Sequence, residues 1–173
     1  DGPPLKSFIF DVTDGETRMA QYAGQTLHAV RSVQAKFHGL NLHNRLGIIP
    51  PNKEFCTQLT YLLERELDVE FPGQFQLVDA ATASCECTLS GRTSSKSHRQ
   101  SITMDSIEEM DGMEWLIVIC VGLDSAAGEG TSDLDFAEAR SQLYRGVTRA
   151  HMMVVAVNEF ISDGWLAFLT NVR

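Results

Sequence analysis

Long apolar runs are missing from this chain of 173 residues. No stretch approaches the roughly 20 apolar residues that a bilayer-spanning helix needs, so the sequence predicts no insertion into a membrane. The opening residues, Asp1-Gly2-Pro3-Pro4, lack both the basic segment and the apolar core of a secretory signal peptide. We therefore expect an intracellular, reducing compartment, either the cytoplasm or the nucleus. The same opening is equally compatible with an internal cut from a longer chain.

Positive charge is also scarce, because 14 lysines and arginines face 23 aspartates and glutamates and the formal net charge is −9. A surface of this sign repels nucleic acid unless a local basic patch outweighs it. The only concentrated basic stretch is Arg-Thr-Ser-Ser-Lys-Ser-His-Arg at 92–99. A phosphate-contacting loop is one interpretation of this stretch, and a solvated flexible loop is the one we favour.

Cysteine is limited to four residues. Cys56 falls in a helix pattern and Cys120 in an apolar strand pattern, so we expect both to be small core residues. Cys85 and Cys87 have no matching second pair, which makes them a poor zinc site, and no metal site is predicted. Internal repeats are absent too. With 43% hydrophobic residues, the length indicates one globular domain spanning 1–173.

Apolar periodicity predicts strands that alternate with helices. The expected strands are 7–12, 46–49, 75–78, 100–104, 115–121 and 151–157. Thr13 and Glu16 have the spacing of a capping box before a first helix that ends at Gly39. Asn52 is expected to cap a second helix, which Phe71-Pro72-Gly73 ends.

The remaining segments complete this organisation. We expect a turn or short helix at 106–111, a helix at 133–147 and a closing helix at 162–169, with mobile loops at 80–99 and 124–132. The alternation predicts an α/β three-layer sandwich with a mostly parallel sheet. The unbroken apolar character of 115–121 and 151–157 predicts that both are inner strands of that sheet.

The most informative stretch is Leu-Tyr-Arg-Gly-Val-Thr-Arg-Ala at 143–150, where an amphipathic helix runs into Arg149 and a strand follows at once. An arginine at a helix end beside a sheet edge is well placed to hold two phosphate oxygens, because its guanidinium is bidentate and always charged. The alternative is a surface arginine that pairs with a nearby carboxylate.

A second segment, 105–124, reads Asp-Ser-Ile-Glu-Glu-Met-Asp-Gly-Met-Glu and then an apolar strand. Together the two segments resemble the last two motifs of superfamily-one helicases of the UvrD and Rep type. Those motifs run Thr-x-His-x-x-Lys-Gly-Leu-Glu and Tyr-Val-Ala/Gly-Leu/Val-Thr-Arg-Ala. The residues at matching positions are Ser106, Gly112, Met113 and Glu114 in the first motif, and Tyr144, Gly146, Val147, Thr148, Arg149 and Ala150 in the second.

The resemblance implies the second RecA-like motor domain, a P-loop NTPase-type fold without its phosphate-binding loop. In the family, ATP and magnesium lie in a cleft whose other wall is an N-terminal P-loop domain. The stretch 91–97 is one residue too short for that loop and lacks its second glycine. The chain alone is therefore expected to bind neither cofactor and to need a P-loop domain or other protein subunits as partners, with nucleic acid reached through the parent protein.

Residue roles follow from the same resemblance. Arg149 would be catalytic, because it would reach the γ-phosphate and stabilise charge in the transition state. Glu114 would accept a hydrogen bond from the ribose, and Gly112 and Tyr144 belong to the same nucleotide-binding set. Ser106 and Thr148 would contact nucleic acid. Other interpretations remain open: a core aromatic for Tyr144, a capping carboxylate for Glu114 and a turn former for Ser106.

Three departures from the family pattern support a second hypothesis. Glu108 and Asp111 stand at the family's histidine and lysine positions, and the stretch 47–52 lacks the family's arginine. A degenerate domain retained as a structural or interaction module would fit these changes and the acidic surface, whereas the intact motif residues fit a motor domain. We expect an acid such as Glu108 or Asp111 to hold Arg149 in a scaffold. In a motor domain, Arg149 should be free of carboxylates within roughly 4 Å.

Overall fold

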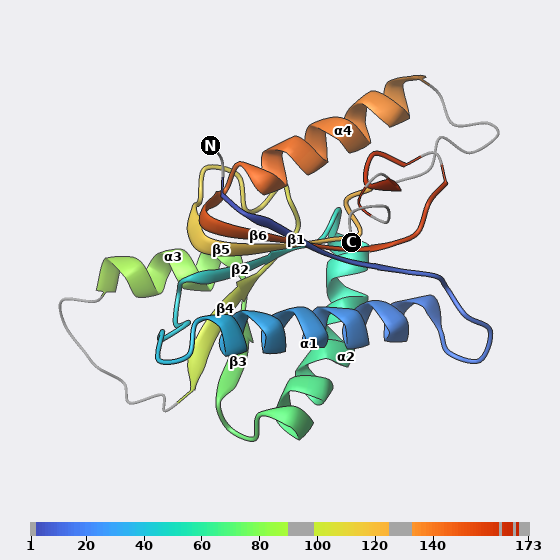
Figure 1. The fold of residues 1–173 in the computed structure, drawn as a ribbon. Helices are drawn as coiled ribbons and strands as arrows, with labels where there is room; N and C mark the ends of the chain where they lie inside the picture. Colours follow the sequence, from blue (N-terminus) through green and yellow to red (C-terminus); the bar gives the residue numbers. More distant parts are fainter. Residues whose placement is uncertain (1–2, 90–98, 125–132, 163, 168, 170–173) are drawn as a thin grey trace.

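Six parallel strands form a single sheet in the order β1-β6-β5-β2-β4-β3 (Figure 1). The computed structural model describes residues 3–89, 99–124, 133–162, 164–167 and 169. The strands are β1 (Leu5–Phe10), β2 (Leu46–Ile49), β3 (Phe75–Val78), β4 (Gln100–Met104), β5 (Trp115–Val121) and β6 (Ala150–Glu159). The helices are α1 (Arg18–Lys36), α2 (Lys53–Glu70), α3 (Ala80–Leu89) and α4 (Asp133–Val147).

Helices cover both faces of the sheet, which confirms the three-layer α/β fold. In Figure 1, α1 and α2 lie on one face and α4 lies on the other. On the first face, residues of α1 and α2 such as Tyr22 and Leu63 pack with alternate strand residues such as Ile119 and Val155. On the second face, α4 and the segment 105–114 pack against the other strand residues, including Val118.

The two strands predicted to be internal are internal. β6 pairs with β1 on one side and with β5 on the other, and β5 also pairs with β2. Every residue from Ile117 to Val121 is at most 2% exposed. A strand covered by helices on both faces has no polar side to present, so its sequence reads as a continuous apolar run.

Helix starts were predicted with mixed success. Asn52 caps α2 as expected, since its side chain accepts a hydrogen bond of 2.9 Å from the Phe55 amide. The prediction for Thr13 was wrong, because Thr17 caps α1 and accepts from the Ala20 amide at 3.2 Å. The backbone of Thr13 instead forms two hydrogen bonds with the side chain of Gln21: the Thr13 amide donates at 3.0 Å and the Thr13 carbonyl accepts at 2.9 Å. This exchange closes a longer loop before the helix.

Two further expectations need correction. The stretch 80–99 is not wholly a loop: α3 occupies Ala80–Leu89, while 90–98 lie outside the described residues. The side chain of Asp79 caps α3 by accepting a hydrogen bond of 2.7 Å from the Thr82 amide. The second correction concerns β1, which begins at Leu5 and not at residue 7. Most of the expected loop at 124–132 also lies outside the described residues.

The expected closing helix at 162–169 was also wrong, because its described residues form turns and 3₁₀ geometry. The buried carboxylate of Asp124 accepts hydrogen bonds from the Trp165 and Leu166 amides at 2.9 and 2.7 Å. The Gly164 and Ala167 amides bond three residues back, to Ile161 and Gly164. The amides of Trp165 and Leu166 therefore donate to a distant carboxylate, and the other two amides form the shorter bonds of a 3₁₀ turn in place of those of an α-helix.

Candidate functional site

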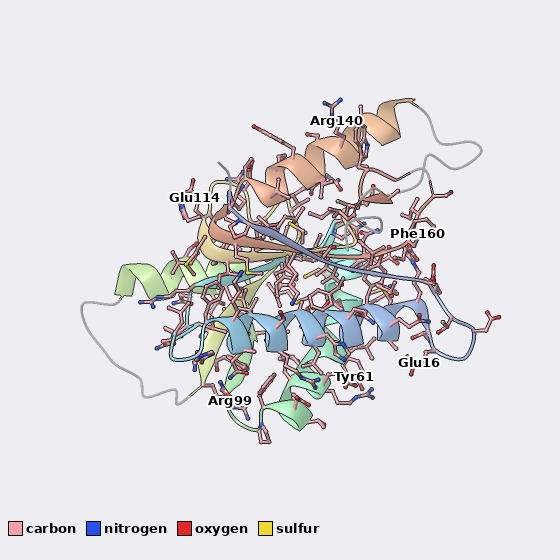
Figure 2. The ribbon with its side chains drawn as sticks, in the orientation of Figure 1. Glu16, Tyr61, Arg99, Glu114, Arg140 and Phe160 are labelled. Carbon is pink, nitrogen blue, oxygen red and sulfur yellow. The ribbon has the colours of Figure 1, made fainter. Side chains whose placement is uncertain are left out.

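The two motif segments meet at the amino end of the sheet. Ala150 begins β6 directly beside Trp115 at the start of β5, and the Trp115 amide donates to the Arg149 carbonyl at 3.0 Å. Glu114 and Arg149, which precede these two strands, therefore share one edge. Figure 2 shows Glu114 at this edge, at the opposite end of the sheet from Phe160, which follows β6.

Arg149 directly follows the last turn of α4, where the helix packs closely against β5. A Cβ added at Gly146 would lie 2.7 Å from a Leu123 methyl and 3.1 Å from the Cys120 sulfur, so glycine lets the helix approach β5. The Arg149 amide donates to the Gly146 carbonyl at 3.2 Å, and the Thr148 hydroxyl donates to the Arg145 carbonyl at 3.0 Å. The backbone of Arg149 is thus held by α4 through its amide and by β5 through the Trp115 amide.

The Arg149 side chain is tied to an internal acid. Its guanidinium Nη2 contacts the Asp111 carboxylate, as the scaffold hypothesis predicts, and Asp111 fills this role rather than Glu108. Arg145 approaches the other oxygen of the same carboxylate at 3.4 Å. The Arg149 side chain is 18% exposed, and its buried Nε has no hydrogen-bond partner among the described residues.

Glu114 and Gly112 lie beside this ion pair. The Glu114 carboxylate is 2.7 Å from Nε2 of His151, and both side chains are more than half exposed. Gly112 occupies the turn before β5 with a φ of 81°, a backbone conformation that favours glycine. The structure therefore brings Gly112, Glu114 and Arg149 together, which the sequence pattern led us to expect from their positions before adjacent strands.

The other predicted residues are more scattered. Tyr144 is 69% exposed, so the interpretation of it as a core aromatic was wrong. Thr148 is exposed next to Arg149. Ser106 follows the carboxyl end of β4, at the opposite edge of the sheet, and is 2% exposed. Its carbonyl accepts from the Met110 amide at 3.1 Å, which is the turn-forming role that the alternative interpretation gave it.

A cavity of about 530 Å³ at the carboxyl edge was missed by sequence reasoning. It lies between the carboxyl ends of β5 and β2, which are followed by helices on opposite faces of the sheet, α4 and α2. Such a topological switch point is where ligands of open α/β sheets bind. Arg18 lines it and forms two 2.9 Å hydrogen bonds with Glu159, which raise the pKa of the arginine. Burial raises the pKa of neighbouring Tyr22 to about 12.

Several polar groups of this cavity, among them Arg18, Glu159 and Asp124, are already paired inside the protein. The Tyr22 hydroxyl accepts from the Glu159 amide at 3.2 Å, and Asp124 is used by the turn after β6. The signal in the sequence is faint: polar residues follow the ends of strands, and Gly122 directly follows the apolar run of β5. We assign no chemistry to the cavity.

Metal binding has no support in the described part of the chain, where no three His, Cys, Asp or Glu side chains are grouped to hold an ion. Cys56 and Cys120 are buried core residues as predicted, whereas Cys85 is exposed and the side chain of Cys87 lies outside the described residues. No helix among the described residues is long and apolar enough to cross a membrane.

Comparison with solved structures identifies a similar fold. The C-terminal domain of a possible DNA helicase from Lactobacillus plantarum WCFS1 superposes with a TM-score of 0.52 and 16% sequence identity. The superposition covers 92% of this chain and 74% of that chain. No protein-family model matches the sequence, and the search of curated proteins finds no match. At this level of identity the likeness is one of fold, consistent with a RecA-like domain.

Proposed function

We propose that this chain is the second RecA-like domain of a larger helicase-like protein, of the UvrD and Rep type, and forms one wall of an ATP cleft. The observation that carries the proposal is that Gly112, Glu114 and Arg149 lie together at the amino edge of the sheet, although up to 37 positions separate them. The fold likeness to a helicase C-terminal domain supports the same assignment.

The residues of this edge fit a triphosphate nucleotide. The guanidinium of Arg149 would hold γ-phosphate oxygens and stabilise the charge that develops as the terminal phosphoryl group is transferred. The exposed carboxylate of Glu114 can accept a hydrogen bond from a ribose hydroxyl. Magnesium and the phosphate-binding loop would come from a partner domain, because the chain contains neither that loop nor a grouped set of metal ligands among its described residues.

A structural or protein-interaction role is the second candidate, and the Arg149–Asp111 ion pair favours it. That pair meets the criterion for a scaffold, and the burial of Ser106 removes one expected nucleic-acid contact. We still place the ATP cleft first on grounds of magnitude. Asp111 is 56% exposed although the Arg149 side chain is only 18% exposed, and pairs between exposed side chains contribute roughly 0–1 kcal/mol. A polyphosphate carries several charges and can displace such a carboxylate.

Nucleotide hydrolysis by the protein that carries this chain tests the proposal. Arg149→Ala should lower the ATP turnover number on the order of 10³-fold, the effect expected for an arginine that stabilises transferring phosphate. Arg65→Ala is the matched control, because Arg65 is an exposed arginine on α2 whose ion-pair partner is the adjacent Glu66. Turnover that survives Arg149→Ala unchanged would leave the structural role as the better account.

A further inference from the structure

Two arginines share one carboxylate at the amino edge of the sheet. Nη2 of Arg149 contacts Oδ1 of Asp111, and Nη2 of Arg145 lies 3.4 Å from Oδ2. In these contacts two guanidinium groups face one carboxylate, and the neighbouring Glu114 contacts Nε2 of His151 at 2.7 Å instead. Arg149 also keeps a buried Nε without a hydrogen-bond partner among the described residues. The cluster has more donor capacity than Asp111 can satisfy.

Both partners of the longer contact, Arg145 and Asp111, depart from the helicase pattern. That pattern has lysine where this chain has Asp111, and valine where it has Arg145. The positive charge has therefore moved from the turn before β5 to the last turn of α4, and a negative charge has replaced it in the turn. The side chains of Arg145 and Asp111 are 34% and 56% exposed, so water can solvate the carboxylate if it leaves.

We propose that Arg145 and Arg149 form a two-arginine site for a polyphosphate chain, and that Asp111 occupies this site when no anion is bound. A carboxylate and a phosphate present similar oxygens to a guanidinium, so one can replace the other. A polyphosphate offers each arginine a separate oxygen. Affinity for inorganic polyphosphate rests on these residues alone, whereas a nucleoside triphosphate as the physiological ligand rests on the proposed function.

Titration of the isolated chain with inorganic tripolyphosphate tests this site, followed through the arginine Nε–Hε signals by NMR at low salt. Asp111→Asn removes the competing carboxylate and should tighten binding roughly tenfold, a change of about 1.4 kcal/mol. Glu108→Gln is the matched control, because it removes an exposed acid of the same turn for which no ion pair with either arginine is found, and it should change affinity less than about twofold. Arg145→Gln in the Asp111→Asn background should weaken tripolyphosphate binding roughly to the affinity of the parent protein.

The proposal is overturned if Asp111→Asn binds no tighter than Glu108→Gln, or if Arg145→Gln leaves the affinity unchanged. Thermal unfolding of each variant establishes that it is folded, and Asp111→Ser serves as the second variant if Asp111→Asn is not. The outcome is separate from the test by ATP turnover. An absent Asp111 effect leaves the ATP cleft standing, and unchanged turnover in Arg149→Ala leaves the polyphosphate site standing.

Discussion

Gly47 lies at the centre of the sheet, in β2, where its backbone pairs with Val118 of β5 and Thr103 of β4. A Cβ added there would lie 2.7, 3.0 and 3.1 Å from three atoms of the Trp115 indole. The ring is 4% exposed and packs among other buried residues, so it cannot swing away without disturbing them. We therefore expect Gly47→Ala to destabilise the domain by overpacking.

The same substitution at Gly24 should have the opposite sign. Gly24 lies in the interior of α1, and nothing stands within 4 Å of the position that an added methyl group would take. Alanine is favoured over glycine in a helix interior by about 1 kcal/mol, partly because it restricts the unfolded chain. This variant is the matched control, since the added atom is identical and only its surroundings differ.

The magnitudes follow from packing. Inserting a methyl group into a well-packed core costs about 1–3 kcal/mol, so we expect a loss of about 2 kcal/mol for Gly47→Ala and a gain of up to about 1 kcal/mol for Gly24→Ala. In a domain of this size each kcal/mol moves Tm by about 2–4 °C. The melting temperature should fall by roughly 4–8 °C in the first variant and rise by roughly 2–4 °C in the second.

Urea unfolding followed by circular dichroism measures both variants, with unchanged m-values as evidence that the unfolded state is the same. A Trp115→Leu background completes a double-mutant cycle, in which Gly47→Ala should lose most of its cost because the ring is gone. The steric argument fails if Gly47→Ala is as stable as the parent protein, or if its cost is the same with leucine at position 115.

Three further outcomes follow from the same observations. The isolated chain should release no phosphate from ATP, because it has no phosphate-binding loop; steady release that Arg149→Ala abolishes would contradict this. It should bind single-stranded DNA weakly or not at all at about 150 mM salt, because a net charge of −9 opposes phosphate contacts; fluorescence anisotropy showing a micromolar complex would contradict this. Burial raises the pKa of Tyr22 from 10.0 to about 12, so the folded state holds the phenolic proton more tightly than the unfolded state. The free energy of unfolding should fall between pH 10 and 12, by up to about 1.4 kcal/mol per pH unit, and Tyr22→Phe should remove that fall in urea unfolding.

Local patterns were sufficient for most of the architecture. The bounds predicted for β2, β3, β4 and β5 match the structure. β2 and β5 are short apolar runs, whereas β3 and β4 are short stretches that mix apolar and polar residues. The Asn52 cap was also predictable from local sequence, since the side chain and the amide that donates to it lie three residues apart. The co-location of Glu114 and Arg149 followed from two motifs that each precede an inner strand.

Other features depend on contacts between residues far apart in the chain. Nothing local to 162–169 indicates that the Asp124 carboxylate accepts hydrogen bonds from its amides. The first amide of α3, that of Ala80, likewise donates to the distant Asp105 carboxylate at 3.3 Å. The exposure of Tyr144 depends on how α4 rotates as Gly146 packs against β5. A periodicity argument describes one element at a time and cannot set that rotation.

The sequence by itself determined the order of the six strands along the chain, the two inner strands and the placement of Glu114 and Arg149 before them, because each depends on residues within a few positions of one another. It missed α3 and predicted a closing helix that does not form. The tertiary structure alone decided the state of Arg149. Pairing of Trp115 with Ala150 brings Asp111 to a guanidinium 38 positions away, and Arg145 joins them from the last turn of α4. Charge partners at such separations are set by strand register and helix packing, which no short pattern records.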